Sequence, residues 1–179
     1  MWIELSWLAA MAPEPPSEFP SGLKAFLYVV GIIFFLLLNA FFVASEFSIV
    51  KVRPSQLEAE EDPASPRVKT AMRIVNHLDG YLSANQLGIT MASLALGFLG
   101  EPFVEALVAP VLLMTGMSVW WVKLISFSLA IVSFTFLHVV VGELIPKSLA
   151  IRRPVQVTLA LAKPLNAFYR AMHWAIVVL

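Results

Sequence analysis

Glu143 is the only charged side chain between Lys123 and Lys147, in the run LISFSLAIVSFTFLHVVVGELIPK. A carboxylate at the end of a membrane-length apolar segment normally faces a bundle interior, a water-filled cavity or a bound cation. Pro146 follows closely and has no N–H to donate to the carbonyl of Gly142, so a helix running through here would leave that oxygen free. A carboxylate beside a freed carbonyl oxygen is chemistry suited to a hard cation.

The elements that must position these groups are membrane-length helices. The 179 residues are 59% hydrophobic and have a mean hydropathy of +0.83, so most of the chain is expected in or on a bilayer. Apolar runs predict transmembrane helices over residues 23–50, 82 to about 99, and about 121–145. Glycines and a proline at 97, 100 and 102 predict that the second span is shortened or broken. The expected fold is an all-α membrane protein with three spans.

Basic residues predict the orientation of these spans. Five of the twelve Lys and Arg lie between Lys51 and Arg73 and five between Lys147 and Arg170. The positive-inside rule then places the N-terminus outside and the C-terminus in the cytoplasm, in a multi-pass protein of the inner (plasma) membrane.

We expect a short outer segment over 1–22, an ion-binding transmembrane domain over 23–153, and a juxtamembrane helix over 154–179. A fourth span over 154–179 is the alternative, and the apolar ending WAIVVL predicts that the natural chain continues.

Composition also excludes several classes of function. A formal net charge of zero argues against a nucleic-acid partner. The absence of cysteine rules out disulfides and thiolate metal sites. No Ser/His/Asp set or phosphate-binding loop can be assembled from these residues, so the chain is not expected to be an enzyme.

Polar side chains of the three predicted spans fall at one depth, in the cytoplasmic half. Carboxylate, amide, hydroxyl and carbonyl oxygens suit Mg²⁺ or Na⁺ better than copper or zinc. Four of them on the second span occupy or adjoin one helix face. The groups are Ser45 and Glu46 on span one, Asn85, Gln86, Thr90 and Ser93 on span two, and Gly142 and Glu143 on span three.

Each of these residues also has a purely structural interpretation. Glu143 could pair with Lys147, and Glu46 with Lys51. The hydroxyls of Ser45, Thr90 and Ser93 could bond carbonyls of their own helices. Asn39, Asn85 and Gln86 could join helices through hydrogen bonds. His138 and His173 fit packed or interfacial positions.

Three stretches resemble the transmembrane domain of the CorC/cyclin M (CNNM) family of magnesium transporters, in its bacterial CorC form. They are NAFFVASEFSIVKVR at 39–53, LSANQLGITMASLALGFLGEP at 82–102 and VVVGELIPKSLAIRRP at 139–154. The resemblance implies a homodimer in the lipid bilayer, with three transmembrane helices and a cytoplasmic juxtamembrane helix. It also implies that nucleotides bind only to CBS-pair domains beyond this chain, and that the protein exports Mg²⁺ with Na⁺ as the coupling ion.

The same resemblance implies a ligand set. Mg²⁺ would be bound, largely dehydrated, in an inward-facing acidic cavity, and span three would move about a hinge at Gly142 and Pro146. A membrane anchor that dimerises a regulatory module, and a Mg²⁺ sensor without transport, are the alternative functions. The implied Mg²⁺ ligands are Ser45, Asn85, Ser93, Gly142 and Glu143, and supporting or Na⁺-binding positions are Asn39, Glu46, Gln86, Thr90 and Ser133.

Overall fold

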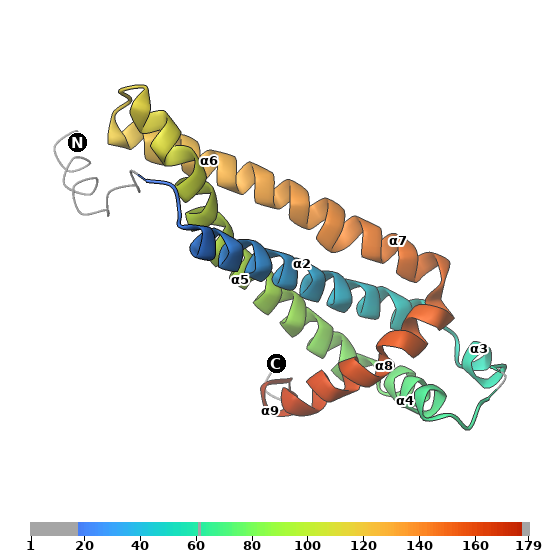
Figure 1. Cartoon of the computed structure of the whole chain (residues 1–179). Coiled ribbons are helices and arrows are strands. Elements are labelled where there is room, and N and C mark those ends of the chain that lie inside the picture. Colours follow the sequence, from blue (N-terminus) through green and yellow to red (C-terminus); the bar gives the residue numbers. More distant parts are fainter. Residues whose placement is uncertain (1–17, 61, 177–179) are drawn as a thin grey trace, which may run out of the picture. The chain divides into compact units, whose positions relative to one another are not determined.

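The structure is a computed structural model that describes residues 18–60 and 62–176, and nearly all of these residues are helical. Figure 1 shows the helices in chain order. The long ones are α2 (Gly22–Lys51), α5 (Leu78–Met114) and α6 (Val119–Leu137), the last of which continues through the π-helix η1 (His138–Leu144) into α7 (Ile145–Arg152). The shorter ones are α3 (Pro54–Glu58), α4 (Pro66–Asn76), α8 (Pro154–Ala171) and α9 (His173–Ile176).

Three helices of the described residues are long and apolar enough to cross a membrane. They run over Gly22–Lys51, Leu78–Met114 and Val119–Arg152. The third includes α6, η1 and α7 as one continuous helix. The predicted all-α class with three spans is confirmed, and the segment beginning at Pro154 is a separate helix that does not qualify as a span.

The prediction of a shortened or broken second span is wrong. Helix α5 continues through Gly97, Gly100, Pro102 and Pro110. A proline removes one N–H from the helix, but in an apolar environment the remaining backbone groups still find partners only within the helix. Gly100 is better explained by packing, because a Cβ there would lie 2.7 Å from the Phe134 ring.

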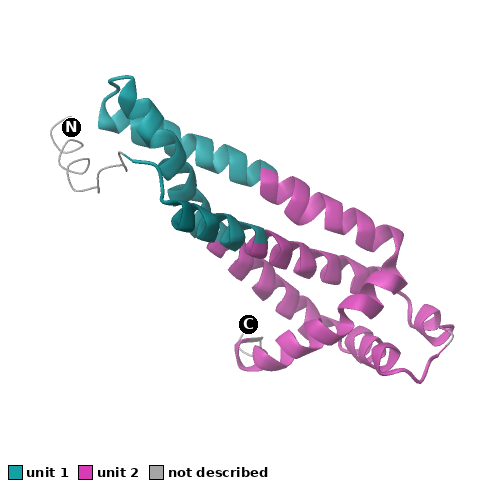
Figure 2. Cartoon of the chain, viewed as in Figure 1, with its two compact units in different colours: residues 1–33, 96–136 teal, residues 34–95, 137–179 magenta. Residues whose placement is uncertain are grey.

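The chain divides into two compact units (Figure 2). Unit 1 comprises residues 1–33 and 96–136, and unit 2 comprises residues 34–95 and 137–179. Within unit 1 the rings of Tyr28 and Phe103 lie 5.8 Å apart. Unit 2 contains every predicted site residue except Ser133.

The core of unit 2 fixes α8 against the ends of the long helices. Tyr81 of α5 donates a 2.7 Å hydrogen bond to Asn166 of α8, and its ring stacks on Tyr169 at 4.3 Å. Residues 154–171 therefore form a helix packed beside α4 and α5. The predicted segments 1–22 and 154–179 extend in part beyond the described residues. The buried cluster consists of Ile49, Val52, Leu57, Val68, Ala71, Ile74, Tyr81, Ala162 and Leu165.

Candidate functional site

One contact and one shared buried cluster indicate how α2 and α5 face each other in unit 2. A Cβ added to Gly88 would lie 2.5 Å from the Phe42 ring, so these two positions are in direct contact. Ile49 and Tyr81 belong to one buried cluster. The residue order of these two pairings is that of antiparallel helices, and in such a register Ser45 and Asn85 take matching positions, each three residues from the Phe42–Gly88 contact. We therefore place Ser45 opposite Asn85 across the α2–α5 interface.

Ser45 and Asn85 are both 0% exposed. Neither the Ser45 hydroxyl nor either polar atom of the Asn85 amide has a hydrogen-bond partner. A buried polar group without a partner costs about 1–3 kcal/mol. A ligand bound between these two side chains would offset that cost.

A second polar group joins all three long helices through Asn39, which is also 0% exposed. Its amide nitrogen donates to the carbonyl of Gly142 at 3.0 Å, and its amide oxygen accepts from the Ser93 hydroxyl at 3.4 Å. Ser93 also lies 3.4 Å from Nε2 of His138. Because a hydroxyl has one hydrogen, Nε2 of His138 must donate to Ser93 if Ser93 donates to Asn39.

The local sequence of η1 explains why Asn39 can reach this carbonyl. Pro146 cannot supply the N–H that an α-helix would direct at Gly142, and the helix adopts π geometry over His138–Leu144. Gly142 is buried, and a Cβ on it would lie 2.9 Å from the Asn39 amide nitrogen and 3.0 Å from the His138 ring. Glycine at 142 is therefore needed for this close approach.

A cavity of about 210 Å³ lies beside this network. Carboxylates from two helices, Glu46 and Glu143, line it together with Asn39 and His138. The Lys147 ammonium lies 4.4 Å from the centre of the Phe47 ring, as a cation–π contact. The described residues contain no Glu143–Lys147 ion pair, so that structural interpretation of Glu143 is not the one found. The remaining lining residues are Val43, Phe47 and Ile89.

The predicted site residues thus fall into three neighbouring arrangements in unit 2. Ser45 and Asn85 are buried without partners. Asn39 links Ser93 to Gly142, and Glu46 and Glu143 share the cavity. Pro146 is buried at the start of α7. Within the described ranges no three His, Asp or Glu side chains lie close enough together to hold a metal ion. A cation here would depend largely on neutral oxygens.

Other predicted residues lie away from these arrangements. Gln86 and Thr90 are exposed, and the Thr90 hydroxyl donates to the Gln86 carbonyl of its own helix at 2.8 Å. Ser133 is exposed and belongs to unit 1. The buried face of α5 instead carries Asn85 with the small residues Ala84, Gly88 and Ala92.

His138 is the residue whose place the sequence interpretation missed. We expected it to be packed or interfacial, whereas it lines the cavity and contacts Ser93. Its spacing of five residues from Glu143 gave no signal in the sequence, because residues five apart do not share a face of an α-helix and the π geometry of η1 is seen only in the structure.

Three membrane-length helices with an oxygen-rich interior define a multi-span α-helical membrane domain. Residues 30–179 match the family described as the cyclin M transmembrane N-terminal domain. The chain belongs to this family, as the resemblance in its sequence predicted.

Bacterial relatives support the same assignment. The chain is 46% identical over 143 residues to the UPF0053 protein YhdT of Bacillus subtilis, which covers 80% of this chain and 31% of the relative. It is 48% identical over 136 residues to YhdP of the same organism, covering 74% of this chain and 30% of the relative. The UPF0053 protein sll0260 of Synechocystis is 28% identical over 148 residues, covering 83% and 33%. The chain therefore spans about a third of the length of these relatives.

Proposed function

We propose that this domain transports Mg²⁺ across the membrane, as a Na⁺-coupled exporter. The observation that carries the proposal is that Ser45 and Asn85 are both fully buried and that their side-chain polar atoms have no partners. Buried polar groups are normally satisfied, and each exception needs an explanation, of which a bound ion is one. The hydroxyls of Ser126 and Thr158 are also buried without partners, but Ser45 differs from them because it adjoins Glu46, which lines the cavity. Hydroxyl and amide oxygens are ligands that Mg²⁺ accepts.

The neighbouring cavity supplies the charge that such an ion requires. Glu46 and Glu143 can together balance two positive charges, and the proximity of Asn39 and Gly142 adds neutral oxygens. Mg²⁺ demands oxygens at about 2.1 Å in octahedral geometry. Ser93 and the Gly142 carbonyl are already engaged with Asn39, so binding would exchange those hydrogen bonds for metal contacts. The lost hydrogen bonds would reduce the net affinity for Mg²⁺, so that the ion could be released.

Movement of the third span would carry the ion to the other side. The π-helix at His138–Leu144 and the proline at 146 interrupt the regular α-helical hydrogen bonding, and such interruptions are common bending points. An inward Na⁺ gradient would drive the cycle by competing for the same oxygens. We further propose a homodimer, with nucleotide binding confined to parts of the longer relatives outside this chain.

The test replaces Glu143 by Gln and by Ala and measures Mg²⁺ binding by calorimetry on the purified chain in detergent. We expect a loss of affinity of about tenfold or more, equivalent to about 1.4 kcal/mol, because the carboxylate charge is lost while its shape is kept in Glu143→Gln. Glu101→Gln, an exposed acid in unit 1, is the matched control and should bind as the unmodified chain does. Unchanged affinity in both Glu143 variants would remove this residue from the site.

A second function, that of a membrane anchor or sensor without transport, is favoured by one observation. The Asn39–Gly142 hydrogen bond at 3.0 Å is the kind of contact that simply joins helices. Mg²⁺ flux into proteoliposomes separates the two functions. An anchor or sensor shows no flux above that of empty vesicles, whereas a transporter shows flux that Glu143→Gln diminishes.

A further inference from the structure

The helices α4 and α8 carry basic residues and no acidic ones. Their sequences are PRVKTAMRIVN and PVQVTLALAKPLNAFYRA. Lys69 and Arg73 are four residues apart and share one side of α4, while Lys163 and Arg170 are seven apart and share one side of α8. All four are exposed. We call these four residues the basic face.

Packing holds the two helices of the basic face in place. Val68, Ala71 and Ile74 of α4 and Ala162 and Leu165 of α8 belong to one buried cluster. The Tyr81–Asn166 hydrogen bond and the Tyr81–Tyr169 stack fix α8 to α5. The face is therefore preformed.

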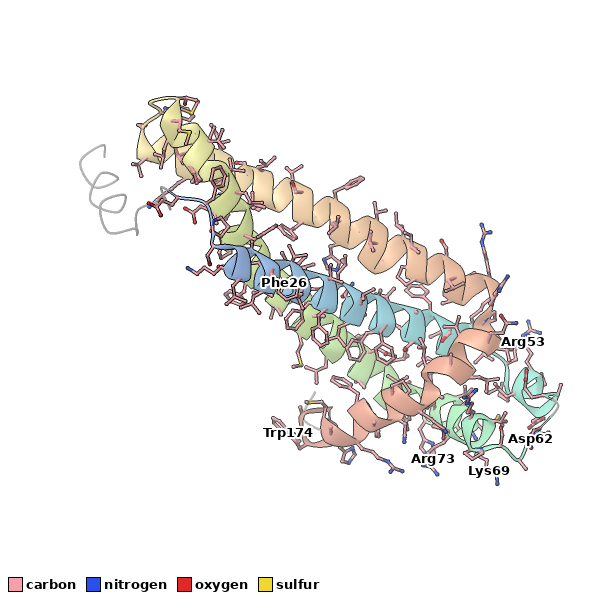
Figure 3. The ribbon with its side chains drawn as sticks, in the orientation of Figure 1. Phe26, Arg53, Asp62, Lys69, Arg73 and Trp174 are labelled. Carbon is pink, nitrogen blue, oxygen red and sulfur yellow. The ribbon has the colours of Figure 1, made fainter. Side chains whose placement is uncertain are left out.

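The two helices of the basic face, α4 and α8, directly adjoin the membrane-length helices along the chain. His77 alone separates α4 from α5, and Arg153 alone separates α7 from α8. Just beyond α8, the Trp174 side chain is 74% exposed, and tryptophan favours the headgroup level of a bilayer. Figure 3 shows Lys69 and Arg73 on the same side of α4, with Trp174 at the other end of the paired helices.

Acidic residues lie at the margin of this face. Glu60 and Asp62 line a groove of about 680 Å³ that also contains Arg67 and Lys163. Arg67 does not belong to the basic face, whereas Lys163, which lines the same groove, belongs to it because Lys163 shares one side of α8 with Arg170. Asp79 is exposed at the first turn of α5. The other three residues of the basic face, Lys69, Arg73 and Arg170, do not line that groove.

We propose that the basic face binds the head groups of anionic phospholipids at the membrane surface next to the spans. Four exposed cations on amphipathic helices at the ends of membrane helices are the pattern that attracts anionic lipid. The exposed Trp174 independently favours a membrane surface over a soluble acidic protein. The bound lipid would hold α8, and through Tyr81 the inner end of α5, at a fixed depth. This inference does not depend on Mg²⁺ transport.

The test measures thermal unfolding of the whole chain in detergent with added phosphatidylglycerol or phosphatidylcholine. We expect phosphatidylglycerol to raise the midpoint by about 5 °C more than phosphatidylcholine, because a ligand of the folded state stabilises it. Replacing Lys69, Arg73, Lys163 and Arg170 together by Gln should abolish most of that difference. Added salt should reduce it in the unmodified chain.

The matched control replaces four other exposed basic residues by Gln. They are Lys51, Arg53, Arg152 and Arg153. It removes the same charge from a different surface and should keep most of the phosphatidylglycerol effect. An equal loss in both fourfold variants would overturn the proposal in favour of unspecific charge attraction. Equal stabilisation by the two lipids would also overturn it, and glycerol 3-phosphate giving the full effect would point to a soluble phosphate ligand. Unchanged midpoints in phosphatidylcholine would show that the variants fold.

Discussion

At the scale of single residues, serines three positions apart on α2 have different environments. The Ser48 hydroxyl donates to the Ser45 carbonyl at 3.0 Å, whereas the Ser45 hydroxyl is buried without a partner. Satisfied and unsatisfied polar groups make opposite contributions to stability. The two serines therefore provide a controlled comparison between a residue kept for the fold and one that the fold alone does not require.

We expect Ser45→Ala to leave the thermal midpoint without Mg²⁺ unchanged or slightly raised, because an unpaired buried hydroxyl is removed. Stabilisation by added Mg²⁺ should fall in the same variant. Ser48→Ala should do the reverse, losing about 1 kcal/mol of stability while keeping the Mg²⁺ effect. Thermal unfolding with and without Mg²⁺ measures both. If Ser45→Ala kept full stabilisation by Mg²⁺, Ser45 would not be a ligand.

At the scale of elements, the third span combines a regular helix with an irregular segment. α6 is α-helical through Leu137, η1 is a π-helix, and α7 resumes α geometry at Ile145. π segments within α-helices frequently occur at functional sites. Here η1 brings His138 and Glu143 to one cavity and the Gly142 carbonyl to Asn39.

Pro146→Ala tests whether this irregular segment matters for transport. The new N–H can donate to the Gly142 carbonyl within the helix, so we expect higher thermal stability and a weaker contact with Asn39. Mg²⁺ flux in proteoliposomes should fall. Pro110→Ala, a proline inside α5 in unit 1, is the control that should stabilise without changing flux. Full flux from Pro146→Ala would exclude the proposed hinge.

At the scale of the whole molecule, the arrangement in the membrane is set by charge and hydrophobic length. Three helices of the described residues are long and apolar enough to cross a membrane, and an odd number of crossings would place the two ends of the chain on opposite sides. Ten of the twelve basic residues fall between Lys51 and Arg73 or between Lys147 and Arg170, at the ends of the first and third helices and in the regions that follow them. The positive-inside rule predicts that these regions are cytoplasmic.

Single cysteines can test this orientation because the chain has none of its own. We expect Ser21→Cys and Thr115→Cys to react with a membrane-impermeant maleimide in intact cells, since Ser21 precedes α2 and Thr115 follows α5. Arg153→Cys should react only after the cells are permeabilised. The opposite pattern would invert the orientation and with it the predicted direction of export.

The sequence by itself determined the fold class, the three spans and the family. Hydrophobic length is a local property, so it can be measured along the chain without knowing what packs against what. The closeness of Glu143 to a helix interruption at Pro146 could also be predicted from the sequence, because the two residues belong to one short segment. Its assignment as an ion ligand stays a prediction.

Only the tertiary structure decided which polar residues meet. Helical spacing grouped Gln86 and Thr90 with Ser93, yet the first two are exposed, and Asn85 is buried with the small residues of α5. The burial of Ser45 and Asn85 without partners, and the position of Asn39 between Ser93 and Gly142, depend on the register of separate helices. Periodicity says which side chains share a face, but which face is buried, and against which partner, is set by packing between helices far apart in the sequence.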